Sequence, residues 1–134
     1  MCLAIVRFVR RQQGSVLVEF ALLLPLLVLV LFGITEFGRA FAAYLALSHA
    51  AREGVRIASL GASDAEIEQL VKSRAAAVDS SKLQVTVTPE ESQRLSGSVV
   101  SVKVEYVFTV LIRVISDTTG ATIPMSTTLS MRVE

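Results

Sequence analysis

The chain has 134 residues, enough for one compact domain with an anchoring segment but not for two sizeable domains. Its formal net charge of +1 is nearly balanced, which argues against a nucleic-acid-binding surface. Hydrophobic residues make up 52% of the chain, above the usual globular share, and the excess is concentrated in the first third. Cys2 is the only cysteine, so no disulfide can form within the chain.

The N-terminal residues are basic and carry no acidic side chain before Gly14. The basic residues are Arg7, Arg10 and Arg11. An apolar run of about twenty residues follows, from Ser15 to Ile34, which as an α-helix covers the roughly 30 Å of a bilayer core. We therefore expect a leader over residues 1–14 and a transmembrane helix over residues 15–35. The positive-inside rule places the N-terminus in the cytoplasm and the C-terminal domain outside.

Two residues interrupt the apolar run. Glu19 puts a carboxylate just inside the segment, where burying an unpaired charge costs up to a few kcal/mol, so it needs a partner or a function. Pro25 removes one helical hydrogen bond and clashes with the carbonyl of Ala21. Two interpretations of Pro25 stay open: a mild kink in a lone anchor, or a site where the helix bends or stretches on packing into an assembly.

A secretory signal peptide and an uncleaved signal anchor are the alternatives for this segment. Ala40-Phe41-Ala42 offers a small-x-small cleavage site. The apolar region is longer than a usual signal core, however, and Glu19 would be an odd inclusion. The uncleaved anchor is therefore the stronger of the two alternatives.

The helical pattern continues beyond the membrane segment. Apolar and small residues recur at three- and four-residue spacing in one stripe: Phe37, Phe41, Tyr44, Ser48, Ala51, Val55 and Ala58. Gly38 and Gly54 would allow another backbone to approach closely, and Gly61 is a C-cap candidate. We expect one helix from about Ser15 to about Ser59, its first half in lipid and its second half on a soluble domain.

The remaining chain predicts an α+β domain over residues 36–134, beginning with helix 36–59. Ser63 and Glu66 have the spacing of a capping box, which predicts a second helix over residues 64–78. Asp79-Ser80-Ser81 breaks it. Period-two alternation then predicts three antiparallel strands whose apolar face only the two helices can cover. The expected strands lie at about residues 83–88, 99–111 and 122–133, with Pro124 best placed on an edge strand.

The connection after the second expected strand contains apolar residues. These are Ile112, Val114 and Ile115. Either they form a short helical turn that caps the sheet, which we favour, or they are an exposed patch for a neighbouring subunit.

Residues of the usual catalytic types do not converge anywhere in the sequence. His49 is the only histidine and has no cysteine or second histidine to complete a zinc site. We therefore expect no catalytic residue, no metal, no cofactor and no enzymatic activity. Arg52 and Arg56 share a helical face, and two interpretations stay open: a solvated helix end, or a paired-arginine contact to the domain or to a neighbouring subunit.

Several stretches resemble one protein family. The stretches are Gly14-Ser15-Val16-Leu17-Val18-Glu19-Phe20-Ala21-Leu22, then Pro25, then residues 33–39, residues 50–56 and, more loosely, the ending from Ala121 to Glu134. They are similar to the TadE-like minor pseudopilins of the Tad (Flp-type) pilus apparatus. The chain is too long for the small major Flp pilin. It departs from type IVa pilins in having Ser15 where they have Phe, and in lacking their C-terminal disulfide.

The resemblance implies a processing site and an assembly site. A prepilin peptidase would cut between Gly14 and Ser15, while Glu19, Phe20 and Pro25 would serve recognition and assembly. The new amine of Ser15 and the Glu19 carboxylate of an adjacent subunit could then pair in a lipid-like helical bundle.

The resulting hypothesis is a structural minor pseudopilin that supports biogenesis of a Tad pilus used in adhesion. Its expected partners are the prepilin peptidase, other pilus subunits, the inner-membrane assembly platform and membrane lipid, and no nucleic acid. It would reside in the bacterial inner membrane as a single-pass protein, with a possible pilus association. The alternatives are a TadF-like protein, a pseudopilin of another secretion system, or a plain single-span anchored binding domain.

Overall fold

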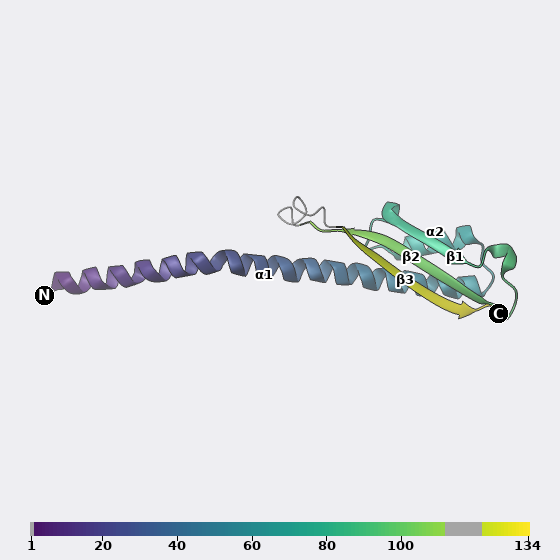
Figure 1. Cartoon of the computed structure of the whole chain (residues 1–134), viewed down its shortest axis with the longest axis horizontal. Helices are drawn as coiled ribbons and strands as arrows, with labels where there is room; N and C mark the ends of the chain where they lie inside the picture. Colours follow the sequence, from purple (N-terminus) through teal and green to yellow (C-terminus); the bar gives the residue numbers. More distant parts are fainter. Residues whose placement is uncertain (1, 112–121) are drawn as a thin grey trace. The chain divides into compact units, whose positions relative to one another are not determined.

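The computed structural model of the chain describes residues 2–111 and 122–134, with side chains from Gly14 onward. The chain divides into two compact units, Met1–Phe37 and Gly38–Glu134. The first unit holds the N-terminal part of helix α1 (Cys2–Ser59), and the second holds the rest of α1 with all the other elements (Figure 1). The predicted connection with Ile112, Val114 and Ile115 lies outside the described residues.

Helix α1 ends where Gly61 permits a left-handed backbone. Gly61 has a φ of 86°, a conformation that costs a residue with a Cβ atom. The N–H of Ala62 donates to the carbonyl of Ile57 at 3.1 Å, and the N–H of Gly61 donates to that of Ala58 at 3.2 Å. These two bonds satisfy carbonyls that the end of the helix would otherwise leave unpaired. They confirm the predicted C-cap.

Helix α2 (Asp64–Arg74) begins with the predicted capping box. The Ser63 hydroxyl accepts from the N–H of Glu66 at 3.4 Å, and the Glu66 carboxylate accepts from the N–H of Ser63 at 3.0 Å. The helix ends at Arg74, four residues earlier than predicted, because Ala75 leaves helical geometry at φ −80° and ψ 44°. Its N–H still donates to the carbonyl of Val71. The sequence therefore overestimated this helix at its C-terminal end.

A 3₁₀ turn, η1 (Ser80–Lys82), follows and leads into the sheet. The Asp79 carboxylate caps it by accepting from the hydroxyl of Ser81 at 2.7 Å and from its N–H at 3.0 Å. Because both bonds favour the ionised form, they hold the pKa of Asp79 below its usual value.

The sheet consists of β1 (Leu83–Thr88), β2 (Val99–Thr109) and β3 (Thr122–Arg132) in the order β1-β2-β3. A second 3₁₀ turn, η2 (Glu91–Gln93), lies between β1 and β2. Both strand pairs are antiparallel, with Val85 opposite Val104 and Val102 opposite Leu129. β3 is an edge strand and carries Pro124, as predicted. This arrangement confirms the α+β fold with two helices and a three-stranded antiparallel sheet.

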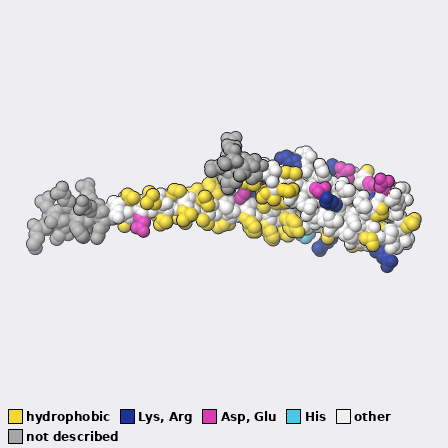
Figure 2. All heavy atoms as spheres, viewed as in Figure 1, with side chains coloured by type: hydrophobic (Ala, Val, Ile, Leu, Met, Phe, Trp, Pro, Cys, Tyr) yellow, Lys and Arg dark blue, Asp and Glu magenta, His cyan; other side chains and the backbone are white. Residues whose placement is uncertain are grey.

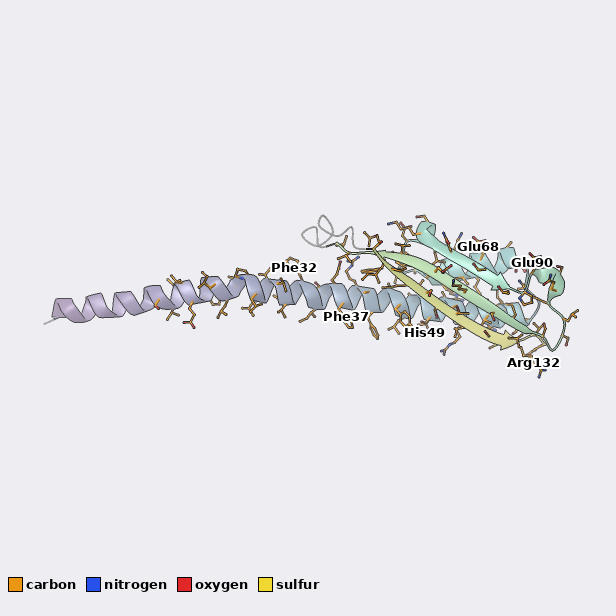
Figure 3. All side chains as sticks on the ribbon, viewed as in Figure 1. Phe32, Phe37, His49, Glu68, Glu90 and Arg132 are labelled. Atoms are coloured by element: carbon orange, nitrogen blue, oxygen red, sulfur yellow. The ribbon has the colours of Figure 1, made fainter. Side chains whose placement is uncertain are left out.

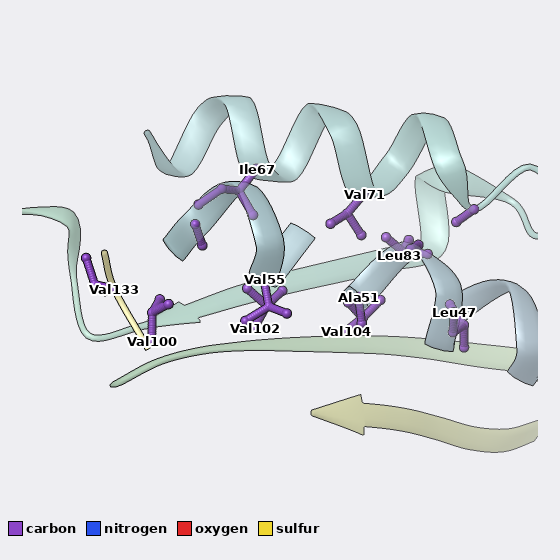
Figure 4. Close-up of a cluster of buried hydrophobic side chains, with 13 residues drawn as sticks. Leu47, Ala51, Val55, Ile67, Val71, Leu83, Val100, Val102, Val104 and Val133 are labelled. Carbon is purple, nitrogen blue, oxygen red and sulfur yellow. The ribbon is translucent and has the colours of Figure 1, made fainter. Parts of the chain in front are cut away.

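The core lies between the two helices and one face of the sheet (Figure 4). Its larger fully buried side chains are Leu47, Ile67, Val71, Val100, Val102 and Val104. The opposite face of β2 carries Ser101, Lys103 and Glu105, and an ion pair joins Lys103 and Glu105 at 2.8 Å. The alternation along β2 therefore places one face on the core and the other outward.

The buried stripe of α1 differs from the predicted one in its first half. Phe41 is 54% exposed and Tyr44 is 47% exposed, whereas both were expected to continue the apolar stripe. The residues that enter the core are mostly small: Ala43, Leu47, Ala50, Ala51, Val55 and Ala58. Small side chains let α1 lie close to the sheet and to α2. The predicted stripe was wrong for Phe37, Phe41 and Tyr44, which are all exposed, and correct for Ala51, Val55 and Ala58, whereas Ser48 is half-buried.

Candidate assembly surface on helix α1

The N-terminal part of α1 is apolar and exposed. Helix α1 from Gly14 to Ser59 contains an 18-residue window with a mean hydropathy of 2.7, none of it buried. By length and composition this helix can cross a membrane. Figure 2 shows hydrophobic side chains gathered along α1, and Figure 3 shows Phe32 and Phe37 pointing away from the helix axis. The exposed apolar surface fits a membrane anchor.

Gly14 and Ser15 lie on α1 and are exposed. A Cβ atom added to Gly14 would meet no heavy atom within 4 Å, so packing within this chain does not require a glycine there. Helical propensity also disfavours glycine, by about 1 kcal/mol relative to alanine. Among the described residues, packing therefore gives no reason for a glycine at position 14. The side chains of Arg7, Arg10 and Arg11 lie outside the part that the structure describes.

Glu19 is exposed on α1 within the apolar segment. Among the described side chains, none pairs with its carboxylate. Ser15 lies four residues before it, and this spacing places both residues on the same face of the helix. Phe20 is likewise exposed, at the next position. The Glu19 carboxylate is thus available to a group supplied by another molecule.

Pro25 lies inside α1 without ending it. The helix continues on both sides, although proline supplies no N–H to the carbonyl of Ala21. A free carbonyl in this segment would need a partner from a neighbouring helix or from water. The two interpretations of Pro25, a kink or a site of bending, both remain compatible with a continuous helix.

The segment from Ala50 to Arg56 has a buried side and an exposed side. Ala50, Ala51, Gly54 and Val55 face the core, while Arg52 and Arg56 are exposed. The Arg56 guanidinium reaches the Glu53 carboxylate at 3.2 Å, an exposed pair between residues three apart. Such a pair contributes well under 1 kcal/mol to stability. His49, labelled in Figure 3, is also exposed, about one helical turn before Arg52.

Gly54 has a packing role within the fold. A Cβ atom added there would lie 2.6 Å from Cγ2 of Val71, and 3.5 and 3.6 Å from side-chain carbons of Val102 and Ile67. Gly54 therefore sits where α1 meets both α2 and β2. The predicted close approach is correct for Gly54, whereas Gly38 has no such neighbour within 4 Å.

Arg94 is a structural residue that sequence reasoning missed. Its side chain is only 3% exposed and pairs with Asp64 at the start of α2. It also donates to the carbonyls of Pro89 at 3.0 Å and Ala62 at 3.2 Å. These bonds hold the connection between β1 and β2 against the N-terminus of α2. A single arginine in a polar connection gives no sequence signal for this role.

An open hollow of about 490 Å³ lies beside α2. Its lining comprises Ile57, Ala62, Glu66, Gln69, Leu70 and Ser73. Its only carboxylate, that of Glu66, is held in the capping box by the N–H and hydroxyl of Ser63. These bonds favour the ionised carboxylate and keep the pKa of Glu66 below its usual value.

Comparison with known proteins finds one family whose model matches part of the chain. A model of the family described as TadE-like protein matches residues 14–56. The match includes Gly14, Glu19 and Pro25 and extends through Arg56, and the sheet lies beyond it. It confirms the resemblance predicted from the sequence. No curated protein and no solved structure matches the chain.

Proposed function

We propose that the chain, whose residues 14–56 form a TadE-like segment, is a membrane-anchored minor pseudopilin of a Tad-type pilus. Its role is structural: α1 supplies the surface for assembly, and the domain of residues 36–134 lies on the extracytoplasmic side. The family match over residues 14–56 supports an association with the Tad pilus. Its partners would be other subunits of that pilus, the assembly platform of the inner membrane, and lipid.

The observation that carries this proposal is the Glu19 carboxylate, which no described side chain pairs, in an apolar, exposed helix. An ionised group in lipid is costly, and such residues almost always face other helices and pair there. A cut after Gly14 would create a charged amine on Ser15, four residues away along the same face. The four-residue spacing lets the amine and the carboxylate meet within one chain, and parallel neighbouring helices also bring them together across an interface.

Gly14 supports the processing step, because the fold gives no reason for a glycine at that position. A residue without a side chain is suited to close approach by a peptidase active site. Residues 1–14 would form the removed leader, and its arginines would orient the chain before the cut. The orientation places residue 1 in the cytoplasm.

Arg52 and Arg56 are candidates for a contact between subunits. Both are exposed, although Arg56 already pairs with Glu53. The buried half of the same segment packs against α2 and the sheet, so the fold holds this part of α1 in place. The two arginines therefore have a fixed backbone from which to meet an acidic surface of a neighbour.

Intact-mass measurement of the membrane-extracted protein tests the proposal. We expect a mature chain that begins at Ser15. Cells that process their other prepilins while leaving this chain with Met1 would contradict processing and favour a plain anchor.

A Glu19→Gln variant tests the pairing role, because it keeps the shape of the side chain and removes its charge. We expect normal processing with a clear loss of pili by electron microscopy, whereas Glu19→Asp, which keeps the charge, retains more of them. A normal number of pili in the Glu19→Gln variant would contradict pairing between Glu19 and the Ser15 amine.

A further inference from the structure

Among the residues that the structure describes, the edge strand β3 has one side that is unpaired over its whole length. It spans Thr122–Arg132 and pairs with β2 alone (Figure 1). The register runs without interruption from Val99 opposite Arg132 to Thr109 opposite Thr122. An edge of this kind presents a row of unpaired backbone donors and acceptors.

The hydrogen bonds beside β3 fix which backbone groups point outward. The N–H of Val133 donates to the carbonyl of Ser98, and its carbonyl accepts from Gly97, both at 2.8 Å. Since backbone direction alternates along a strand, residues 131, 129, 127 and 125 also face β2. The outward N–H groups belong to Ser126, Thr128, Ser130 and Arg132. Position 124 also faces outward, so a proline there removes no hydrogen bond to β2. This explains why Pro124 fits within an 11-residue strand.

The free edge lacks the charges that usually protect such strands. No charged residue occurs from Thr122 to Met131. Arg132 and Pro124 hinder strand pairing only near the two ends of β3. The helix-facing side is also incompletely covered: Ile123 is 45% exposed and Met131 is 40% exposed. Between them Met125 and Leu129 are half-buried and touch the core. Seven residues, Met125–Met131, thus combine an open backbone with a partly exposed apolar row.

We propose that the free edge of β3 binds an extended segment of a different polypeptide, which adds a fourth strand to the sheet. Only an extended backbone supplies donors and acceptors with the alternation that Ser126, Thr128 and Ser130 require. The added segment carries apolar side chains at alternate positions, because they lie beside Met125, Leu129 and Met131 and extend the core. It is uncharged along its middle.

A second copy of the chain fits this edge poorly. Arg39 lies over the Phe108 ring at 5.2 Å, and the N–H of Glu134 donates to the carbonyl of Ser59 at 3.0 Å. Phe108 is opposite Ile123, so β3 runs in the same direction as α1 from Arg39 to Ser59. If two β3 strands paired in antiparallel fashion, the two α1 helices would therefore run in opposite directions. The ends from which the apolar spans continue would then lie at opposite ends of the pair, unlike two chains anchored in one membrane.

Other pairings with a second copy are also unfavourable. Parallel pairing of two β3 edges would place the apolar face of one sheet beside the polar face of the other. The other edge strand, β1, has 6 residues and would leave much of the 11-residue β3 edge unpaired. The exclusion of the antiparallel pair rests on the proposed anchoring, whereas the open edge is a property of the domain itself.

Photocrosslinking of the full chain in its own membranes tests the proposal. The probe is a photoreactive side chain placed at Ser126 or Ser130 beside the edge, with Thr86 on the same sheet face as the reference position. We expect crosslinks to a different polypeptide from the edge positions and not from Thr86. Thr128→Pro removes one outward N–H and leaves the bonds to β2 intact, so it should reduce the crosslink about tenfold. Thr128→Ala keeps that N–H and should retain the crosslink.

Three crosslinking outcomes would overturn the proposal: crosslinks to a second copy only, no crosslinks from the edge, or equal loss in Thr128→Pro and Thr128→Ala. Amide hydrogen exchange of the unmodified chain provides a measurement independent of any folding defect. The N–H groups of Thr128 and Ser130 should exchange quickly in the isolated chain and slowly in native membranes. Equally fast exchange in both would also overturn it. Finding Ser15 at the N-terminus alongside an unoccupied edge would reject this inference while leaving the proposed function intact.

Discussion

At the scale of single residues, Gly54 illustrates how a glycine can be required by its neighbours. A Cβ atom would approach Val71 Cγ2 to 2.6 Å, and Val71 is fully buried with a stiff branched side chain. Overpacking of this kind costs about 1–3 kcal/mol, against about 1 kcal/mol gained in helix propensity. We expect Gly54→Ala to lower the free energy of unfolding by about 1 kcal/mol, measured by chemical denaturation of the detergent-solubilised chain.

Gly38 is the matched control, because a Cβ atom there would meet nothing within 4 Å. Gly38→Ala should cause no loss of stability. Adding Val71→Ala relieves the contact, so Gly54→Ala should become neutral or stabilising in that background. A penalty of the same size in both backgrounds would show that the contact is not the cause.

The sequence predicted close approach at Gly54 but could not identify its neighbour. The identity of the neighbour depends on how α1, α2 and β2 pack, which involves residues far apart in the chain. Arg94 was beyond prediction for the same reason, since its partners Asp64, Ala62 and Pro89 come together only in the folded domain.

At the scale of elements, the capping box is the clearest local signal in the domain. Ser63→Ala should lower the free energy of unfolding by about 1 kcal/mol, because the N–H of Glu66 loses its acceptor. Ser63→Thr, which retains a hydroxyl, should lose less. Equal losses in the two variants would argue that the cap does not stabilise α2.

The capping box of Ser63 and Glu66 also makes the free energy of unfolding depend on pH. The backbone and side-chain bonds from Ser63 lower the pKa of Glu66 in the folded state. A lowered carboxyl pKa stabilises the fold fully above the ordinary value of 4.5, and this contribution disappears as pH falls through the folded pKa. The stability difference between the parent chain and Glu66→Gln should therefore shrink below about pH 4.5 in denaturation experiments.

The errors of prediction also belong to this scale. Aromatic and small residues of α1 both recur at helical spacing, so periodicity alone defined more than one stripe. The fold selects the small side chains, because they allow the sheet and α2 to approach, and leaves Phe41 and Tyr44 exposed. Strand alternation was more reliable, because one face of β2 is covered by helices and the other is polar.

At the scale of the whole molecule, the division into Met1–Phe37 and Gly38–Glu134 separates the apolar segment from the core. Among the described residues, the core cluster lies between Leu47 and Val133, within the second unit. The α1 part of the domain is held by packing against α2 and the sheet rather than by its continuation into the apolar segment. The core of the second unit can therefore stabilise this domain by itself.

We expect residues 38–134 alone to fold into the same α+β structure in aqueous solution. The measurements are circular dichroism, which should show mixed helix and strand, and thermal unfolding, which should be a single cooperative transition. Replacing the fully buried Val102 by Asp in the same fragment is the control, since an unpaired buried charge should abolish that transition. A fragment that stays unfolded or melts without cooperativity would mean that the apolar segment is needed for folding. Cooperative unfolding would instead show that folding does not need the segment before Gly38, which leaves its exposed apolar surface and Glu19 for anchoring and assembly.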